Sequence, residues 1–172
     1  SYKRAVPFLT TVQRASRPFV HNDKVYVGFA DGQIAAFSLE EGVILWERRL
    51  STGAKFVDVD SSPILFRDNI IAGSVNGELA VIHPETGAIL RRLDYKVSRN
   101  PVVHKGKLVV STIFGDVILL DKNLQEIVRA KIGEGPMSSI ISWKGGLVAS
   151  SVTQEIVLLN DEDLSIRSEF FL

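Results

Sequence analysis

Short apolar runs alternate with polar turns along nearly the whole chain. The pattern is most complete between Ser61 and Leu93, where four apolar runs are separated by Arg67–Asn69, by Asn76-Gly77 and by a Glu-Thr-Gly turn. Asn-Gly between two apolar runs is a strong hairpin signal, because a type I′ turn needs positive φ at both central residues. This stretch therefore predicts four short strands in one small antiparallel sheet.

The same pattern recurs with a period near forty residues. The central hairpin turns fall at Asp31-Gly32, Asn76-Gly77, Phe114-Gly115 and Thr153-Gln154, and their second residues are 45, 38 and 39 positions apart. Fourteen positions before each second turn residue stand Pro18, Pro63, Pro101 and Ile140. Four strands per unit at this period are typical of β-propeller blades. The sequence therefore predicts an all-β propeller with four four-stranded antiparallel blades.

The composition of the runs indicates where each strand lies in its blade. We expect second strands at 25–29, 70–74, 108–112 and 147–151, third strands at 33–37, 78–82, 116–120 and 155–159, and fourth strands near 43–50, 88–94, 126–132 and 165–172. The second strands are apolar nearly throughout, as expected where neighbouring blades cover both faces. The fourth strands carry more charge, which suits an outer edge that must resist pairing with other chains.

These repeats predict one propeller domain over residues 1–172. Its four blades are expected at 15–50, 51–95, 96–133 and 134–172, with an enlarged connection at 51–60. Residues 1–14 precede the first proline, where an outer strand belongs. We interpret them as an N-terminal clasp strand that is able to complete a blade elsewhere.

Composition narrows the class of protein. Acidic and basic residues balance at 20 each, so no net charge favours nucleic acid or an anionic membrane. The chain has no cysteine, which excludes disulfides, thiolate metal sites and cysteine nucleophiles. No apolar run approaches the ~20 residues of a membrane helix, and the N-terminus lacks a signal-peptide apolar region. Whether that N-terminus is natural or cut stays open.

The repeats resemble the quinoprotein-like (PQQ-type) propeller family, and within it the BamB group of outer-membrane assembly lipoproteins. The resemblance lies in Val25-Tyr26-Val27-Gly28, Asp31-Gly32, Ala36-Phe37 and Gly42-Val43-Ile44-Leu45-Trp46. The second unit keeps Asn76-Gly77 and Glu85-Thr86-Gly87 but has Arg91 in the tryptophan position. Members of this family usually close eight blades. The resemblance therefore implies either two chains forming one eight-bladed ring, which we favour, or a closed four-bladed ring.

Catalysis is not expected. A quinone-dependent dehydrogenase needs a complete propeller, acidic and Asn ligands for calcium, and a catalytic aspartate. Trp46 is predicted to pack between blades instead of stacking on a cofactor. His21, His83 and His104 fall in separate turns and are expected to be solvated, so they predict no shared zinc site. We expect no cofactor and no metal.

Other polar residues receive structural interpretations as well. The acidic stretches 58–60 and 160–163 lack the spacing of a calcium-binding loop and predict turns. The serines before the prolines, Ser16, Ser61 and Ser62, are expected to form turn hydrogen bonds.

Candidate partner contacts come from the outer strands and the enlarged connection. Arg48-Arg49 and Arg91-Arg92 lie on successive fourth strands, where they serve either edge protection or a partner-binding rim. Lys55 and Phe56 lie in the long connection, where the aromatic ring either contacts a partner or fills a seam. Trp143 stands in a turn where the other units are polar, and we interpret it as a seam residue, with an exposed contact as the alternative.

The family resemblance implies a non-catalytic scaffold in outer-membrane β-barrel protein assembly. It implies a protein partner such as a BamA-like assembly component, a location at the periplasmic face of the outer membrane, and a lipid anchor outside this segment. A homodimer follows from the two-chain ring, and no nucleic-acid partner is expected. The alternatives are a generic propeller binding or sensor module and a quinoprotein-dehydrogenase-like fragment.

Overall fold

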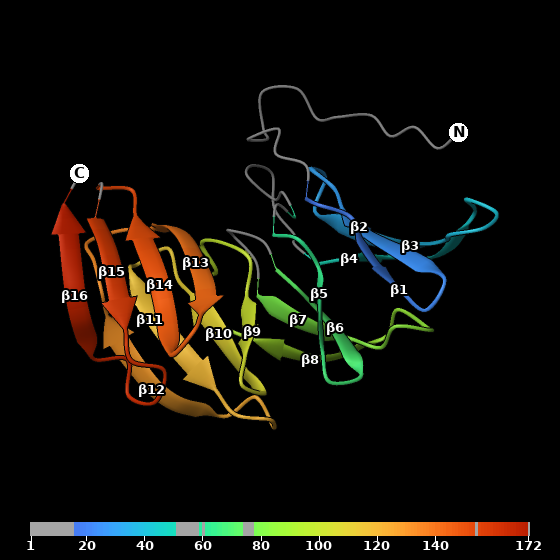
Figure 1. The fold of residues 1–172 in the computed structure, drawn as a ribbon. Helices are drawn as coiled ribbons and strands as arrows, with labels where there is room; N and C mark the ends of the chain where they lie inside the picture. Colours follow the sequence, from blue (N-terminus) through green and yellow to red (C-terminus); the bar gives the residue numbers. More distant parts are fainter. Residues whose placement is uncertain (1–15, 51–58, 60, 74–77, 154, 172) are drawn as a thin grey trace. The chain divides into compact units, whose positions relative to one another are not determined.

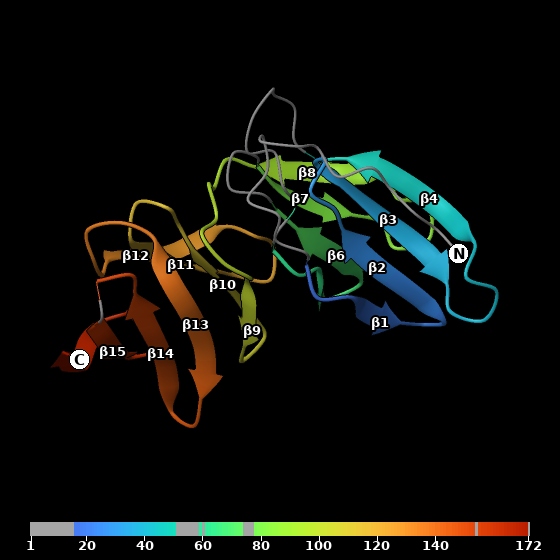
Figure 2. The same cartoon turned by 90° about the horizontal axis from the view of Figure 1, so that it is seen from above.

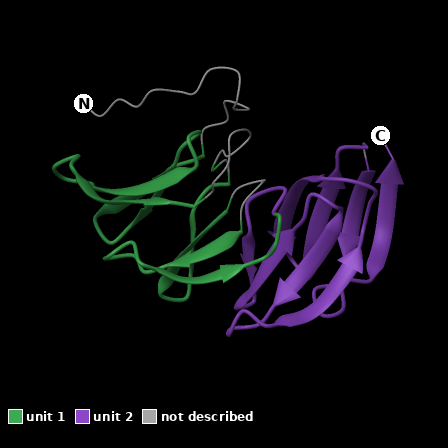
Figure 3. Cartoon of the chain, turned by 180° about the vertical axis from the view of Figure 1, so that it is seen from behind, with its two compact units in different colours: residues 1–96 green, residues 97–172 purple. Residues whose placement is uncertain are grey.

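Four separate antiparallel sheets make up the described part of the protein. A computed structural model describes residues 16–50, 59, 61–73, 78–153 and 155–171 (Figure 1). These residues form strands and turns without helices, and none of them belongs to a helix able to cross a membrane. The chain divides into two compact units, 1–96 and 97–172, and each unit holds two sheets (Figure 3). The predicted four blades are thereby confirmed.

Each sheet, or blade, is built from four consecutive strands. Blade 1 contains β1 (Phe19–His21), β2 (Lys24–Gly28), β3 (Gln33–Ser38) and β4 (Ile44–Arg49). Blade 2 contains β5 (Ile64–Phe66), β6 (Asn69–Ala72), β7 (Leu79–Ile82) and β8 (Ile89–Leu93). Blade 3 contains β9 (Val102–His104), β10 (Lys107–Ser111), β11 (Asp116–Leu120) and β12 (Glu126–Lys131). Blade 4 contains β13 (Met137–Trp143), β14 (Gly146–Ser151), β15 (Glu155–Leu159) and β16 (Ile166–Phe171).

Within every blade the strands pair in sequence order, so the fourth strand lies at an edge as predicted. Pro18, Pro63 and Pro101 directly precede the first strands, where a missing N–H costs little. The third and fourth strands of each blade share a one-residue register shift, which falls at Ala36/Phe37 in blade 1 and at equivalent positions in the others. Such a bulge increases the local twist of the outer strand.

The hairpin turns differ in whether one or two consecutive residues have positive φ. The first hairpins of blades 1 and 3 have positive φ at two consecutive residues, Asn22-Asp23 (44° and 57°) and Lys105-Gly106 (46° and 74°), as type I′ turns require. In the second hairpin of blade 1, Gly32 has a φ of 83° while Asp31 keeps a negative φ. Three predicted features lie outside the described residues. They are the type I′ turn at Asn76-Gly77, the clasp strand at 1–14, and the connection 51–60 apart from Val59.

A serine closes each blade onto its second strand; it precedes the first strand in blades 1 to 3 and lies within β13 in blade 4. The Ser16 hydroxyl accepts the Gly28 N–H at 2.8 Å and donates to the Gly28 carbonyl at 3.1 Å. Ser61 makes the same pair of bonds with Gly73, at 3.0 and 2.7 Å. In unit 2, Ser98 pairs with Ser111 and Ser138 with the Ser151 carbonyl. Ser16 and Ser61 therefore form hydrogen bonds as predicted, but their partners lie 12 residues away and not within a turn.

Each unit buries one apolar cluster between its two blades. In unit 1, Tyr26, Ile34 and Ala36 of blade 1 pack with residues of blade 2, namely Ile70, Ala72, Ala80 and Ile82. In unit 2, Val109, Val117 and Leu119 of blade 3 pack with blade 4 residues Met137, Ile140, Leu147, Ala149, Val157, Leu159 and Leu164. The first strands β9 and β13 lie side by side in this unit (Figure 2). The blades are thus held together face to face by buried apolar side chains.

Removing one serine clamp is expected to destabilise unit 1. Ser61→Ala leaves the buried Gly73 N–H and carbonyl without their side-chain partner, which costs about 1–3 kcal/mol of unfolding free energy. Urea unfolding followed by circular dichroism measures the loss. Ser62→Ala is the matched control, because Ser62 accepts the Arg17 N–H in an exposed bond, and a smaller effect is expected there. Equal stability of Ser61→Ala and the wild type would contradict the clamp.

Candidate functional site

The turn between the third and fourth strands has one shared backbone form in three blades. We call it the docking turn, and it covers 38–42 in blade 1, 83–87 in blade 2 and 160–164 in blade 4. In each, the fifth residue donates its N–H to the first residue's carbonyl, at 2.9 Å for Gly42 and Gly87 and 3.1 Å for Leu164. The fifth residue also has positive φ, between 58° and 68°. The second residue of the turn is Leu39 in blade 1, Pro84 in blade 2 and Asp161 in blade 4.

In unit 1 the docking turn of blade 2 binds the tryptophan of blade 1. The Trp46 indole N–H donates to the Pro84 carbonyl at 2.8 Å, and its ring lies 5.8 Å from Tyr26. Gly87 has a φ of 67°, and a Cβ there would come within 2.5 Å of the Trp46 ring. Both the positive φ and the close approach of the ring require glycine at this position. The prediction that Trp46 packs between blades is confirmed.

Charged side chains add to the same junction. Lys24 pairs with Glu85 of the docking turn at 2.9 Å, and the Arg48 guanidinium donates to the Thr86 carbonyl at 3.0 Å. The Tyr26 hydroxyl is fully buried and has no hydrogen-bond partner among the described residues. Burial, with the nearby Glu85 carboxylate, raises the pKa of Tyr26. The phenol therefore stays neutral within this junction at physiological pH.

In unit 2 the docking turn of blade 4 binds a buried histidine of blade 3. The His104 Nε2 lies 2.6 Å from an Asp161 carboxylate oxygen, and its Nδ1 lies 2.7 Å from the Ser142 hydroxyl. Lys105 also pairs with that Asp161 oxygen at 2.5 Å. His104 is only 4% exposed, so the prediction of a solvated turn histidine is wrong at this position. Its ring fills the apolar seam because both ring nitrogens have partners.

Ser142, His104 and Asp161 contain the residue types of a serine-hydrolase triad, but their surroundings favour a structural link. Asp161 is shared with Lys105, which neutralises the carboxylate from a second side. Hydrogen bonds from His104 and Lys105 hold the pKa of Asp161 well below its usual range. The group therefore joins two blades through an ionised carboxylate.

The predicted rim arginines all lie at exposed positions of the edge strands β4 and β8. Two of them also contact the neighbouring blade, because Arg48 binds Thr86 and Arg92 donates to the Leu50 carbonyl at 3.0 Å. Arg92 further pairs with Glu78 at 3.5 Å. For Arg49 and Arg91 the structure gives exposure, and their role in partner binding stays a prediction. Lys55 and Phe56 lie outside the described residues.

Trp143 closes β13 and is 54% exposed, so within this chain it is not the buried seam residue that we favoured. Its position in the blade is equivalent to that of His104, since both end a first strand 39 residues apart. The His104–Asp161 contact joins residues 57 positions apart. No sequence pattern signals that pairing, because histidine and aspartate each occupy ordinary turn positions.

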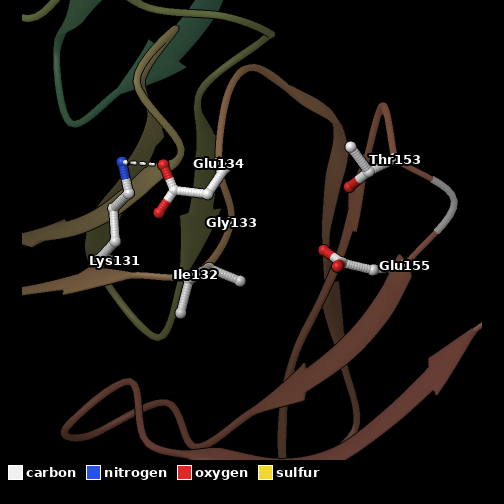
Figure 4. Close-up of a pocket in the computed structure, with 6 residues that line it drawn as sticks. All are labelled: Lys131, Ile132, Gly133, Glu134, Thr153 and Glu155. Atoms are coloured by element: carbon white, nitrogen blue, oxygen red, sulfur yellow. Dashed lines mark ion pairs between the residues drawn. The ribbon is translucent and has the colours of Figure 1, made fainter.

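An open pocket that sequence analysis missed lies among the described residues of unit 2, at the strand ends opposite His104. Its volume is about 360 Å³, and it is lined by Lys131, Ile132, Gly133, Glu134, Thr153 and Glu155 (Figure 4). The connection between blades 3 and 4 forms one wall by packing on Gly115, where a Cβ would lie 2.0 Å from the Gly133 carbonyl oxygen. Glu155 accepts the Ser151 hydroxyl at 3.2 Å, and Lys131 pairs with Glu134 at 3.8 Å. Lys131 thus balances the charge of Glu134, and Glu155 leaves the pocket with a net negative charge.

The His104–Asp161 link predicts an acid-dependent stability of unit 2. Because the folded-state pKa of Asp161 is lowered, its contribution is complete above its unfolded value of about 4 and is lost as pH falls through the folded value. Asp161→Asn should therefore cost about 1–3 kcal/mol at pH 7, and the difference from wild type should shrink below about pH 4. Urea unfolding between pH 7 and pH 2.5 measures both.

The exposed neighbour Glu162 supplies the control for this variant. Glu162→Gln should leave the free energy of unfolding within about 0.5 kcal/mol of wild type at every pH. An Asp161→Asn chain as stable as wild type at pH 7, or a difference that widens toward acid, would rule out the link.

Known proteins give a consistent family assignment. The family model described as outer membrane protein assembly factor BamB matches residues 1–162. BamB of Kangiella koreensis is 30% identical over 138 residues, which cover 77% of this chain and 35% of that protein. BamB of Legionella pneumophila is 38% identical over 60 residues, or 31% of this chain and 16% of that protein. The chain thus spans about a third or less of the curated relatives it matches.

Solved structures agree on the fold. BamB from Moraxella catarrhalis superposes with a TM-score of 0.82 at 20% identity, over 99% of this chain and 54% of that one. The computationally designed Ika8 protein gives a TM-score of 0.59 at 14% identity, over 91% of this chain and 61% of the other. The resemblance to quinoprotein-like propellers is confirmed at the level of fold. Because the family model covers nearly all of the sequence, the chain belongs to the family of the outer membrane protein assembly factor BamB.

Proposed function

We propose that the chain is a non-catalytic scaffold for the assembly of outer-membrane β-barrel proteins. The observation that carries this proposal is the family match over residues 1–162. The proposed location is the periplasmic face of the outer membrane, where a lipid outside this segment would provide the anchor. The proposed partner is a BamA-like component of the assembly machinery.

The geometry of the blade edges supports a role in binding proteins. A fourth strand at a sheet edge has backbone N–H and carbonyl groups on one side without a partner strand, and such an edge accepts an extended segment by strand addition. All four fourth strands occupy this position in the described sheets, and every residue of β16 is exposed. Repeated edges therefore offer several equivalent docking places for an extended partner.

The proposed assembly is a homodimer in which two four-bladed chains complete one eight-bladed ring. Blades depend on face-to-face burial, since each unit buries its apolar cluster between two of them. The described residues contain four four-stranded blades, and members of this family usually close eight.

The proposed partner contacts are the rim arginines and the long connection. Two of the arginines also pack neighbouring blades together. Arg48 and Arg92 contribute to blade packing through their bonds to Thr86 and Leu50, so their removal would also disturb the fold. Arg49 and Arg91 are the proposed probes, because both are exposed on the edge strands β4 and β8. Lys55 and Phe56 complete the proposed surface.

Binding to the BamA-like component tests the proposal directly. Arg49→Ala/Arg91→Ala should weaken binding about tenfold, equivalent to about 1.4 kcal/mol, since arginine contributes strongly at interfaces. Binding is measured by co-purification and by titration of the purified proteins. Lys122→Ala/Lys144→Ala removes two exposed cations from turns of unit 2 and should leave binding unchanged.

The two possible failures have different meanings. If the wild-type chain does not bind the assembly component, the proposed function is wrong. If the wild type binds and the double arginine variant binds equally well, the function stands and the arginine surface is wrong.

A further inference from the structure

The pocket of unit 2 is lined by two carboxylates and one cation. Lys131 lies at the end of β12, Glu134 in the connection to β13, and Glu155 at the start of β15. In Figure 4 the Glu155 carboxylate projects toward the pocket from blade 4, across from the Lys131–Glu134 pair. The Lys131 ammonium also donates to the Phe114 carbonyl at 2.5 Å. The one cation among the lining residues is therefore bound on the blade 3 side of the pocket.

Blade 3 has the same carboxylate position as Glu155, but with cations beside it. Asp116 is the first residue of β11, as Glu155 is of β15, and each accepts a hydrogen bond at 3.2 Å from the hydroxyl four positions earlier. Arg129 pairs with Asp116 at 3.7 Å, and Lys131 lies directly opposite Asp116 in the strand register. Within blade 3 this carboxylate is therefore balanced by neighbouring positive charge.

Blade 4 lacks both of these cations. In its register Phe171 lies opposite Glu155, and Glu169 occupies the position of the blade 3 arginine. Glu155 and Glu169 share one face of the sheet, because residues two apart in a strand point to the same side, and diagonal neighbours are within reach of long side chains. Neither carboxylate has an ion-pair partner among the described residues. Blade 4 therefore adds two unbalanced negative charges on this face.

Exposed apolar side chains stand beside the pocket on two hairpin turns. Phe114 is 56% exposed in the β10–β11 turn, and Val152 is 53% exposed in the β14–β15 turn. Gly115, the residue after Phe114, accepts the N–H of the lining residue Ile132 at 2.9 Å, and Val152 directly precedes the lining residue Thr153. Both turns thus join the pocket wall, and an exposed aromatic ring beside polar groups is typical of a protein-binding surface.

We propose that this pocket binds a lysine or arginine side chain of a protein partner, with the apolar residues next to that cation lying on Phe114 and Val152. The incoming cation supplies the positive charge that blade 4 lacks beside Glu155. The pocket volume of about 360 Å³ is near the lower end of the range for ligand pockets, about 300–1,000 Å³, which suits one long side chain. The apolar rim favours a protein segment, because a small free cation would not extend beyond the pocket. This inference rests on the scaffold role proposed above and names a second contact region for its partner.

Two synthetic peptides test the chemistry of the pocket without the assembly partner. One has an arginine between two leucines, and the other has citrulline, a neutral analogue of arginine, at the same place. In amide NMR titrations the arginine peptide should shift the signals of Gly133 and Thr153 and bind at least about tenfold more tightly than the citrulline peptide. Glu155→Gln should weaken binding of the arginine peptide about tenfold, while its side chain still offers an acceptor to the Ser151 hydroxyl.

The purified BamA-like component tests the same surface with the proposed partner. Glu169→Lys should weaken its binding about tenfold, because a repulsive charge then faces the incoming cation. Glu162→Lys is the matched control, since it makes the same charge reversal at an exposed position beyond the other end of β15 and should leave binding unchanged. Circular dichroism with thermal unfolding confirms that each variant is folded.

The outcomes separate the pocket from the function on which it rests. An arginine peptide that leaves the pocket signals unmoved, or that binds no better than the citrulline peptide, overturns the pocket. So does free arginine amide that binds as tightly as the peptide, since the pocket would then be a site for small cations. A wild type that binds the assembly component, together with a Glu169→Lys chain that binds it equally well, overturns the pocket and leaves the scaffold role standing. A wild type that does not bind the component overturns the scaffold role, and the peptide titrations then decide the pocket alone.

Discussion

Face-to-face burial between neighbouring blades is the constraint on which the rest of this structure depends. A four-stranded sheet with apolar side chains on both faces loses stability when either face meets water, because apolar burial supplies most of the favourable free energy of folding. Each unit meets this constraint by packing one face of its first blade against the facing side of its second blade. The short hairpins and the serine clamps shape single blades, whereas the apolar clusters pack the two blades of a unit together.

Polar contacts between blades lie beside the apolar clusters, at the docking turns. Docking turns meet the preceding blade at the ends of the strands, where backbone carbonyls and charged side chains are close to water. Trp46 bonds to a carbonyl in unit 1, and His104 bonds to a carboxylate in unit 2. The second residue of the docking turn therefore accepts a hydrogen bond through its backbone in unit 1 and through its side chain in unit 2. At both junctions the buried ring nitrogen gains a hydrogen-bond partner from the docking turn.

This division also separates stability from function in the repeat. Side chains on the blade faces pack in the apolar clusters, and the docking turns of blades 2 and 4 bind the preceding blade. The outer strands and connections carry the residues that are free to vary with a binding partner. In a scaffold of this family, specificity would reside in edges and loops, and the apolar frame would keep those edges at a regular spacing.

The sequence by itself determined the blades of this protein. Apolar runs, turn residues and the period near forty residues placed the predicted second, third and fourth strands within about two residues of their observed bounds, because these features act within a single hairpin. The packing of Trp46 between blades was also predictable, because the first repeat contains the family motif Gly42-Val43-Ile44-Leu45-Trp46. Tertiary structure decided the contacts between repeats. Arg48 and Arg92 turn toward neighbouring blades, and His104 is buried against Asp161. These pairings join residues 38 to 57 positions apart, and only the approach of two folded blades brings them together.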